Sequence, residues 1–114
     1  MNLRTAVLVI GAIVAMATTS VERAHAAEFA KKHPRRAQVN RRERRQQGRI
    51  GQGVKNGKLS PREGAKLERQ EGRIKRQERA EVKANGGHLT KGEQRQLNQE
   101  LNQTSREIYR DKHN

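Results

Sequence analysis

Large apolar residues recur at helical spacing in three stretches of this chain. The steps are four residues in the first stretch, seven and eight in the second, and four and seven in the third, at Ile50 and Val54, at Leu67, Ile74 and Val82, and at Leu97, Leu101 and Ile108. Such steps place side chains on one face of an α-helix, and here the apolar stripe is narrow. The pattern predicts three helices, roughly at Arg35 to Lys55, Pro61 to Ala84 and Lys91 to Asp111.

An internal repeat marks the boundaries of these helices. The segment 57–74 begins GKLSPRE, and thirty residues later the segment 87–104 begins GHLTKGE. Asn and Gly stand at the start of each copy, as Asn56-Gly57 and as Asn85-Gly86-Gly87. Both residue types adopt the left-handed backbone conformation that closes a helix C-terminus. The sequence therefore predicts that one helix ends directly before each copy.

Each copy also contains the signal of a helix start. Ser60 lies three residues before Glu63, and Thr90 lies three residues before Glu93. This is the spacing of a capping box, in which the hydroxyl and the carboxylate each accept a hydrogen bond from the other residue's backbone N–H. Pro61 at the first helical position agrees with a helix start. We therefore predict that Ser60, Glu63, Thr90 and Glu93 are helix-capping residues.

The short links between the helices predict antiparallel neighbours in an all-α fold, either as helical hairpins or as an open three-helix bundle. Leu59 and Leu89 stand directly before the caps, and we expect them to reach across to a neighbouring helix. Residues 27–114 hold twelve Leu, Ile, Val and Phe residues, about 14% of that segment, which indicates a small core. A homodimer, or ordering on a partner, would add the stability that such a core lacks.

The first 26 residues have the three parts of a secretory signal peptide. Residues 1–4 are short and cationic, residues 6–17 (AVLVIGAIVAMA) are small or apolar, and Ala24-His25-Ala26 has the small-x-small pattern that signal peptidase recognises. An uncleaved membrane anchor is the alternative, but twelve residues of helix rise about 18 Å against a hydrocarbon core of about 30 Å. We predict cleavage after Ala26, no membrane span after cleavage, and a periplasmic or secreted protein. With no Cys in the chain, neither a lipid anchor nor a disulfide is expected.

Residues 27–34 separate the predicted cleavage site from the first predicted helix. Pro34 suits the first position of a helix, and it disfavours helical conformation at His33. The sequence therefore predicts a flexible, disordered N-terminal arm over 27–34, followed by a single helical domain over 35–114 that contains the repeat.

The chain after the predicted cleavage site is strongly basic. Removing residues 1–26 takes away Arg4, Arg23 and Glu22 and leaves 24 Lys and Arg against 11 Asp and Glu, a balance of +13. Such a surface attracts polyanions through electrostatic steering and counterion release. Export removes the chain from genomic DNA and ribosomal RNA, so nucleic acid would be bound in vitro only. The expected partners are an anionic envelope polymer, a lipid headgroup or an acidic protein.

The basic residues are concentrated in the first predicted helix and its flanks. Between Lys31 and Lys58, eleven basic residues stand against one acid, Glu43. Guanidinium groups suit bidentate contact with phosphate or carboxylate. Five arginines spread over more than half of the helix circumference and are the predicted polyanion-binding residues: Arg41, Arg42, Arg44, Arg45 and Arg49.

The residue types of catalytic and metal centres are missing or isolated in this chain. There is no Cys nucleophile, and Ser60 and Ser105 have no His or acid at motif spacing. The histidines that follow the cleavage site, His33, His88 and His113, lack the spacing of zinc ligands. We predict no catalytic residue, no metal and no cofactor, and therefore a protein that is not an enzyme.

Both copies of the repeat resemble the second half of an EF-hand calcium loop. The Gly, the hydrophobic residue and the final Glu of that loop match Gly57, Leu59 and Glu63, and then Gly87, Leu89 and Glu93. The resemblance implies a helix-loop-helix unit. The positions that supply oxygen ligands in the first half of the loop hold Gln52, Val54 and Asn56 in one copy and Val82, Ala84 and Gly86 in the other. A degenerate EF-hand-like protein without bound calcium is therefore a minor alternative.

The segments LSPRE at 59–63 and LTKGE at 89–93 are also similar to the LTxxQ motif of small periplasmic stress chaperones, with Glu in place of Gln. That resemblance implies a curved helical dimer whose basic, partly apolar concave face binds unfolded clients. As a whole the chain also looks like small exported basic helical proteins of Gram-negative bacteria, a resemblance that implies no particular activity. The first interpretation is an exported, non-enzymatic polyanion-binding protein that uses its Arg-rich helix, and the alternative is a periplasmic LTxxQ-like chaperone or stress protein.

Overall fold

The structure, a computed structural model, describes residues 19–114, and every regular element in that range is a helix. The helices are α2 (Ser20–Lys32), α3 (Pro34–Lys55), α4 (Pro61–Ala84) and α5 (Lys91–Lys112). The predicted all-α class is confirmed, and the three predicted helices begin and end within one residue of α3, α4 and α5. The apolar run at 6–17, which carries most of the signal-peptide prediction, lies outside the described residues.

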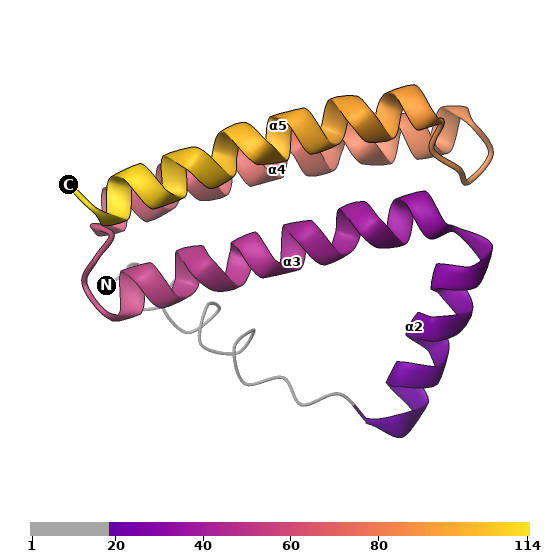
Figure 1. Ribbon diagram of the computed structural model, residues 1–114, viewed down its shortest axis with the longest axis horizontal. Helices are drawn as coiled ribbons and strands as arrows, with labels where there is room; N and C mark the ends of the chain where they lie inside the picture. The colour runs from indigo at the N-terminus through magenta and orange to yellow at the C-terminus, as the bar shows by residue number, and fades with distance from the viewer. Residues whose placement is uncertain (1–18) are drawn as a thin grey trace, which may run out of the picture.

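Helices α3, α4 and α5 lie side by side as an up-down-up bundle, and α2 leaves the bundle at the N-terminal end of α3 (Figure 1). Short links join α3 to α4 and α4 to α5, so α4 is antiparallel to both neighbours (Figure 1). Lys75 of α4 pairs with Glu43 of α3, and Gln70 of α4 donates to Glu107 of α5. The first and third helices of such a bundle are parallel, and α3 and α5 pack directly against each other.

The prediction of three helices with a disordered arm over 27–34 is wrong, because a fourth helix, α2, covers most of that arm. Thr19 and Glu22 form a capping box at its start: the backbone N–H of Thr19 donates to the Glu22 carboxylate at 2.9 Å, and the backbone N–H of Glu22 donates to the Thr19 hydroxyl at 3.2 Å. The helix ends at Lys32, directly before the His33-Pro34 pair. Residues 20–26, assigned above to a signal peptide, thus belong to the same helix as residues 27–32.

Contacts with α3, rather than an apolar stripe, position α2. No residue of α2 is buried, so the hydrophobic pattern used for the other helices is absent there. Instead the Arg36 guanidinium lies over the Phe29 ring at 4.9 Å, and the Phe29 and His33 rings are 5.0 Å apart. Cation–π and ring contacts of this kind contribute little to hydrophobic periodicity, which explains why the periodicity did not reveal α2.

The two links of the bundle close their helices with glycines in the left-handed region. Gly57 has φ 82°, and Gly86 and Gly87 have φ 69° and 107°. After α4 the backbone N–H of Gly87 donates to the Val82 carbonyl at 2.8 Å and that of Gly86 to the Lys83 carbonyl at 3.4 Å, the pattern of a Schellman motif. The repeated Asn-Gly segments therefore turn the chain at both ends of α4.

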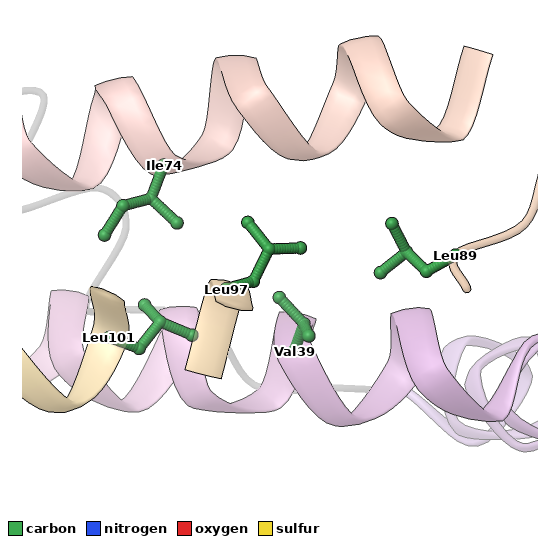
Figure 2. Close-up of a cluster of buried hydrophobic side chains, with 5 residues drawn as sticks. All are labelled: Val39, Ile74, Leu89, Leu97 and Leu101. Carbon is green, nitrogen blue, oxygen red and sulfur yellow. The ribbon is translucent and has the colours of Figure 1, made fainter. Parts of the chain in front are cut away.

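The core consists of two apolar clusters, one toward each end of the bundle. The first contains Val39, Ile74, Leu89, Leu97 and Leu101, whose side chains point into the space between the helices (Figure 2). The second contains Ile50, Leu59, Leu67 and Ile108. Leu59 and Leu89 are only 1% and 2% exposed, so the prediction that these two residues reach a neighbouring helix is confirmed.

The second cluster is tight because α3 and α4 approach each other through glycines. A Cβ atom added to Gly64 of α4 would lie 2.5 Å from Cγ2 of Val54, and one added to Gly53 of α3 would lie 2.7 Å from Cδ1 of Leu59. Such distances are well inside van der Waals contact. Gly53 and Gly64 thus allow the two helices to meet at the closed end of their hairpin.

Candidate functional site

The interface between α3 and α5 is a row of polar side chains, here called the polar seam. At one end Gln38 exchanges hydrogen bonds with Gln94 and Asn98, at 2.9 to 3.1 Å. In the middle, Nε2 of the buried Gln46 donates to the Leu101 carbonyl at 2.7 Å. Most of these partners lie 55 or 56 residues apart in sequence, so each α3 residue of the seam faces the residue about 56 positions later in α5.

Two of the five predicted arginines belong to the polar seam. Nη1 of Arg42 donates to the Asn98 carbonyl at 3.2 Å and to Oδ1 of Asn98 at 3.0 Å. Nη1 of Arg49 donates to Oγ of Ser105 at 2.7 Å, and its Nη2 donates to the Ser105 carbonyl at 3.4 Å. Both guanidinium groups are half-buried and fixed on α5. Arg42 and Arg49 therefore have a packing role in addition to their charge.

The other three predicted arginines, Arg41, Arg44 and Arg45, are exposed on α3. The ion pairs of residues 19–114 are Lys75–Glu43, Lys75–Glu78 and Arg110–Asp111, so none of these three arginines is paired with a carboxylate in that range. The structure thus separates the predicted set into three exposed cations and two that face α5.

A groove of about 660 Å³ runs between α3 and α5 beside the polar seam. Its lining includes four cationic side chains and no carboxylate: Arg42, Arg45, Arg49 and Lys112, with Gln46, Gly48, Gln52 and Ser105 between them. Burial and the neighbouring positive charge of Arg45 lower the pKa of Arg42. We call this feature the cationic groove. Lys112, near the C-terminus, was not predicted as part of any site, because only the fold brings it beside α3.

The opposite side of α3, which faces α4, is acidic. A second groove, of about 420 Å³, is lined by three carboxylates, from Glu43, Glu68 and Glu71, together with Arg44 and Lys75. Glu43 and Glu71 are buried, at 6% and 2% exposed. Lys75 pairs with Glu43 at 3.1 Å, whereas neither oxygen of Glu71 has a hydrogen-bond partner in the described part of the chain. A polar layer therefore separates the two apolar clusters.

Burial shifts the proton affinity of this layer. Burial and, to a smaller extent, the nearby carboxylates of Glu43 and Glu68 together raise the pKa of Glu71 to about 8, against the lowering effect of Arg42. Burial and the charge of Glu78 raise the pKa of Glu43 to about 7, against the lowering effect of Lys75. A buried carboxyl group without partners is more stable when it is protonated. At neutral pH Glu71 is therefore mostly in the neutral form.

The four capping residues of the repeat lie at the helix starts. In the first copy the backbone N–H of Ser60 donates to Oε1 of Glu63 at 2.8 Å, and the backbone N–H of Glu63 donates to the Ser60 hydroxyl at 3.0 Å. Thr90 and Glu93 form the same pair of bonds at 2.9 and 3.1 Å. These bonds, with a contribution from Asn85, lower the pKa of Glu93.

The capping residues belong to the segments that carry the two motif resemblances. Nδ2 of Asn85 donates to Oε1 of Glu93 at 2.7 Å, at the carboxylate that would hold calcium in an EF-hand. Within residues 19–114 no group of three or more His, Asp or Glu side chains could hold a metal ion. Leu59 and Leu89, the first residues of the LTxxQ-like segments, lie in the core and offer no apolar surface to a client.

Three of the four histidines lie in two separate ring clusters. His33 and His88 have ring centroids 5.0 Å apart where α2 meets the α4–α5 link, and His113 stacks on Tyr109 at 3.9 Å near the C-terminus. Burial, with the positive charges of Arg36, His88 and Lys32, lowers the pKa of His33. Ser60 caps α4, and Ser105 accepts a hydrogen bond from Arg49 in the polar seam.

Comparison with protein-family models, with curated proteins and with solved structures found no match to this chain. None of the helices in residues 19–114 is long and apolar enough to cross a membrane. The cationic groove and the exposed arginines of α3 are therefore the candidate site on the evidence of their own geometry.

Proposed function

We propose that this is an exported, periplasmic or secreted, non-enzymatic protein that binds anionic partners through the exposed arginines of α3. One observation carries the proposal: Arg41, Arg44 and Arg45 are exposed and have no carboxylate partner within residues 19–114. Cations that a protein leaves without counter-charge attract polyanions from solution. The partners expected from export are envelope phosphates, lipid headgroups or acidic proteins.

The mechanism is electrostatic. Of the three acids that line the groove beside Arg44, Glu43 and Glu71 are buried and Glu68 is half-buried, and Glu71 is mostly protonated at neutral pH. Burial and protonation weaken the negative charge that would otherwise offset the arginines. Each guanidinium offers a planar set of donors that fits two oxygens of one phosphate or carboxylate. Binding releases counterions, so the affinity falls as the salt concentration rises.

The proposal is tested with the triple variant Arg41→Gln, Arg44→Gln and Arg45→Gln of the full chain. Binding to phosphatidylglycerol vesicles is measured by cosedimentation at several salt concentrations. Three exposed charges, each worth up to about 1 kcal/mol at a surface, predict that binding weakens by ten- to a hundredfold at low salt. A matched control removes three exposed arginines from α4, Arg69, Arg76 and Arg79, and should change binding several-fold less.

All of these proteins have the same residues 1–18, so differences in binding between them arise from the substituted arginines. Salt-independent binding of the unmodified chain would overturn the proposal. Equal losses in the α3 and α4 variants would also overturn it, because they would show that net charge, rather than the α3 surface, decides binding.

A further inference from the structure

The cationic groove differs from the exposed surface of α3 in having walls from two helices. Arg42, Arg45 and Arg49 come from α3, and Lys112 comes from α5. We propose that this groove is a discrete binding site for one small phosphate ligand with two or more negative charges, such as a phosphomonoester or a diphosphate. The inference deepens the proposed function and rests on it for the anionic nature of the ligand.

The side chains that line the groove carry positive charge only. Four cationic side chains surround about 660 Å³ of space, and none of the lining residues is a carboxylate. The positive charge of Arg45 and burial both make the charged form of Arg42 less stable. A bound dianion would reverse that effect, because an opposite charge within a few ångströms stabilises each guanidinium. The groove therefore has an excess of positive charge that a bound anion would offset.

Two of the arginines that line the groove are already held in place by hydrogen bonds. The polar seam fixes Arg42 through the Asn98 carbonyl and amide oxygens, and it fixes Arg49 through Ser105. Each guanidinium has five N–H donors, of which the seam uses only some, so donors remain for a ligand. A ligand thus meets two guanidinium groups whose side chains are already ordered, and ordering flexible side chains is a main cost of binding.

The groove is open at Gly48. This residue lines the groove, and a Cβ atom added there would have no neighbour within 4 Å. The absence of a side chain keeps that part of the groove free and exposes the α3 backbone to it. A planar carboxylate carries one charge, whereas a phosphoryl dianion offers three oxygens to the four cations, so phosphate is the better match.

The first experiment titrates the full chain with inorganic pyrophosphate at about 0.15 M salt, where diffuse surface attraction is screened beyond about 8 Å. We expect saturable binding with one site per chain, measured by calorimetry. The Gly48→Gln variant fills the groove without changing any charge and should weaken binding about tenfold. Gly48→Ala is its control and should bind within about twofold of the unmodified chain.

The second experiment removes charge from the groove without touching the polar seam. Arg45→Gln with Lys112→Gln should weaken pyrophosphate binding about tenfold, whereas the charge-matched pair Arg69→Gln with Arg79→Gln should change it less than about threefold. Thermal unfolding of each variant by circular dichroism verifies that the bundle is intact. Equal effects of the two pairs, or normal binding by Gly48→Gln, would overturn the inference.

The results also separate this inference from the proposed function. If vesicle binding depends on Arg41, Arg44 and salt while pyrophosphate shows no single site, the groove inference fails and the proposed function stands. If neither pyrophosphate nor phosphatidylglycerol vesicles bind, both fail. Vesicles with phosphatidic acid identify the source of the phosphoryl group: competition by free pyrophosphate supports a headgroup in the groove, and saturable pyrophosphate binding without such competition supports a free phosphate ligand.

Discussion

The two sides of α3 accommodate polar and charged side chains at a helix interface in opposite ways. Toward α5, polar and cationic side chains pack in a seam where Gln46, Arg42 and Arg49 each donate to oxygens of the neighbouring helix. Toward α4, carboxyl groups are buried instead, and Glu71 has no partner for either oxygen within residues 19–114. The α5 side keeps its charges by hydrogen bonding, whereas the α4 side favours protonation of its acids.

This difference shows how a narrow apolar core can hold a strongly basic chain. The arginines of the seam bring positive charge to the α5 side without burying it in apolar surroundings, because backbone carbonyls accept their hydrogen bonds. Near neutral pH Glu71 contributes little negative charge, and Lys75 pairs with Glu43, so these two acids do not neutralise the arginines of α3. The same helix is therefore positive toward solvent and toward α5, and nearly neutral toward α4.

The largest expected effect is a dependence of stability on pH that originates in the α4 side. The folded pKa of Glu71, about 8, lies above the ordinary value of 4.5, so its stabilising contribution is complete below pH 4.5 and is lost as the pH rises through 8. We expect the free energy of unfolding to fall by about 4 kcal/mol between pH 5 and pH 9 from Glu71 alone, and Glu43 contributes in the same direction.

Urea unfolding across this pH range measures the effect, and Glu71→Gln should flatten the profile. Glu28→Gln, on the exposed surface of α2, is the control and should leave the profile unchanged. The capping carboxylate of Glu93 acts with the opposite sign, because its lowered pKa makes its contribution disappear at acid pH. Stability should therefore be greatest in mildly acidic solution. A profile that rises from pH 5 to pH 9 would contradict the description of the α4 side.

A smaller effect on stability is expected from replacing one glycine on each side of α3's packing, toward α4 and toward α5. Gly64→Ala places a methyl group 2.5 Å from Val54 at the α3–α4 contact, and we expect it to destabilise the protein by about 2 kcal/mol despite the better helix propensity of Ala. Gly48→Ala, on the open α5 side, should stabilise the protein by up to about 1 kcal/mol. Urea unfolding of both variants tests the contrast, which fails if the two changes have the same sign.

The smallest effect concerns the polar seam itself. Asn98→Ala removes the amide that connects Gln38 with Arg42, and we expect a loss of about 1 kcal/mol, since backbone carbonyls still accept from Arg42. Exposed Asn102→Ala on the same helix is the control. The same variant should weaken pyrophosphate binding several-fold because Arg42 is less firmly positioned. Unchanged binding with reduced stability would show that the seam supports the fold alone.

Part of this description follows from the sequence because it depends on short-range chemistry. The Asn-Gly links and the Ser60-Glu63 and Thr90-Glu93 spacings involve residues only a few positions apart, and the apolar steps from Ile50 to Ile108 define which helix faces turn inward. The helix α2 was missed because its contacts, such as Arg36 over Phe29, do not produce a hydrophobic period. Gln38, Arg42, Gln46 and Arg49 do follow each other at steps of four, four and three, a polar stripe at helical spacing that could have indicated the seam.

What the sequence by itself determined is the helical class, the boundaries of α3, α4 and α5, and the excess of arginine on one helix, since each arises from neighbouring residues or from composition. Only the tertiary structure decided which arginines face solvent and which face α5, and it alone brings Lys112 into the same groove as Arg49 and buries Glu71. These features depend on the rotation and register of whole helices, which are set by the packing of many side chains at once. The properties most relevant to binding and to pH therefore appear only when the three helices are assembled.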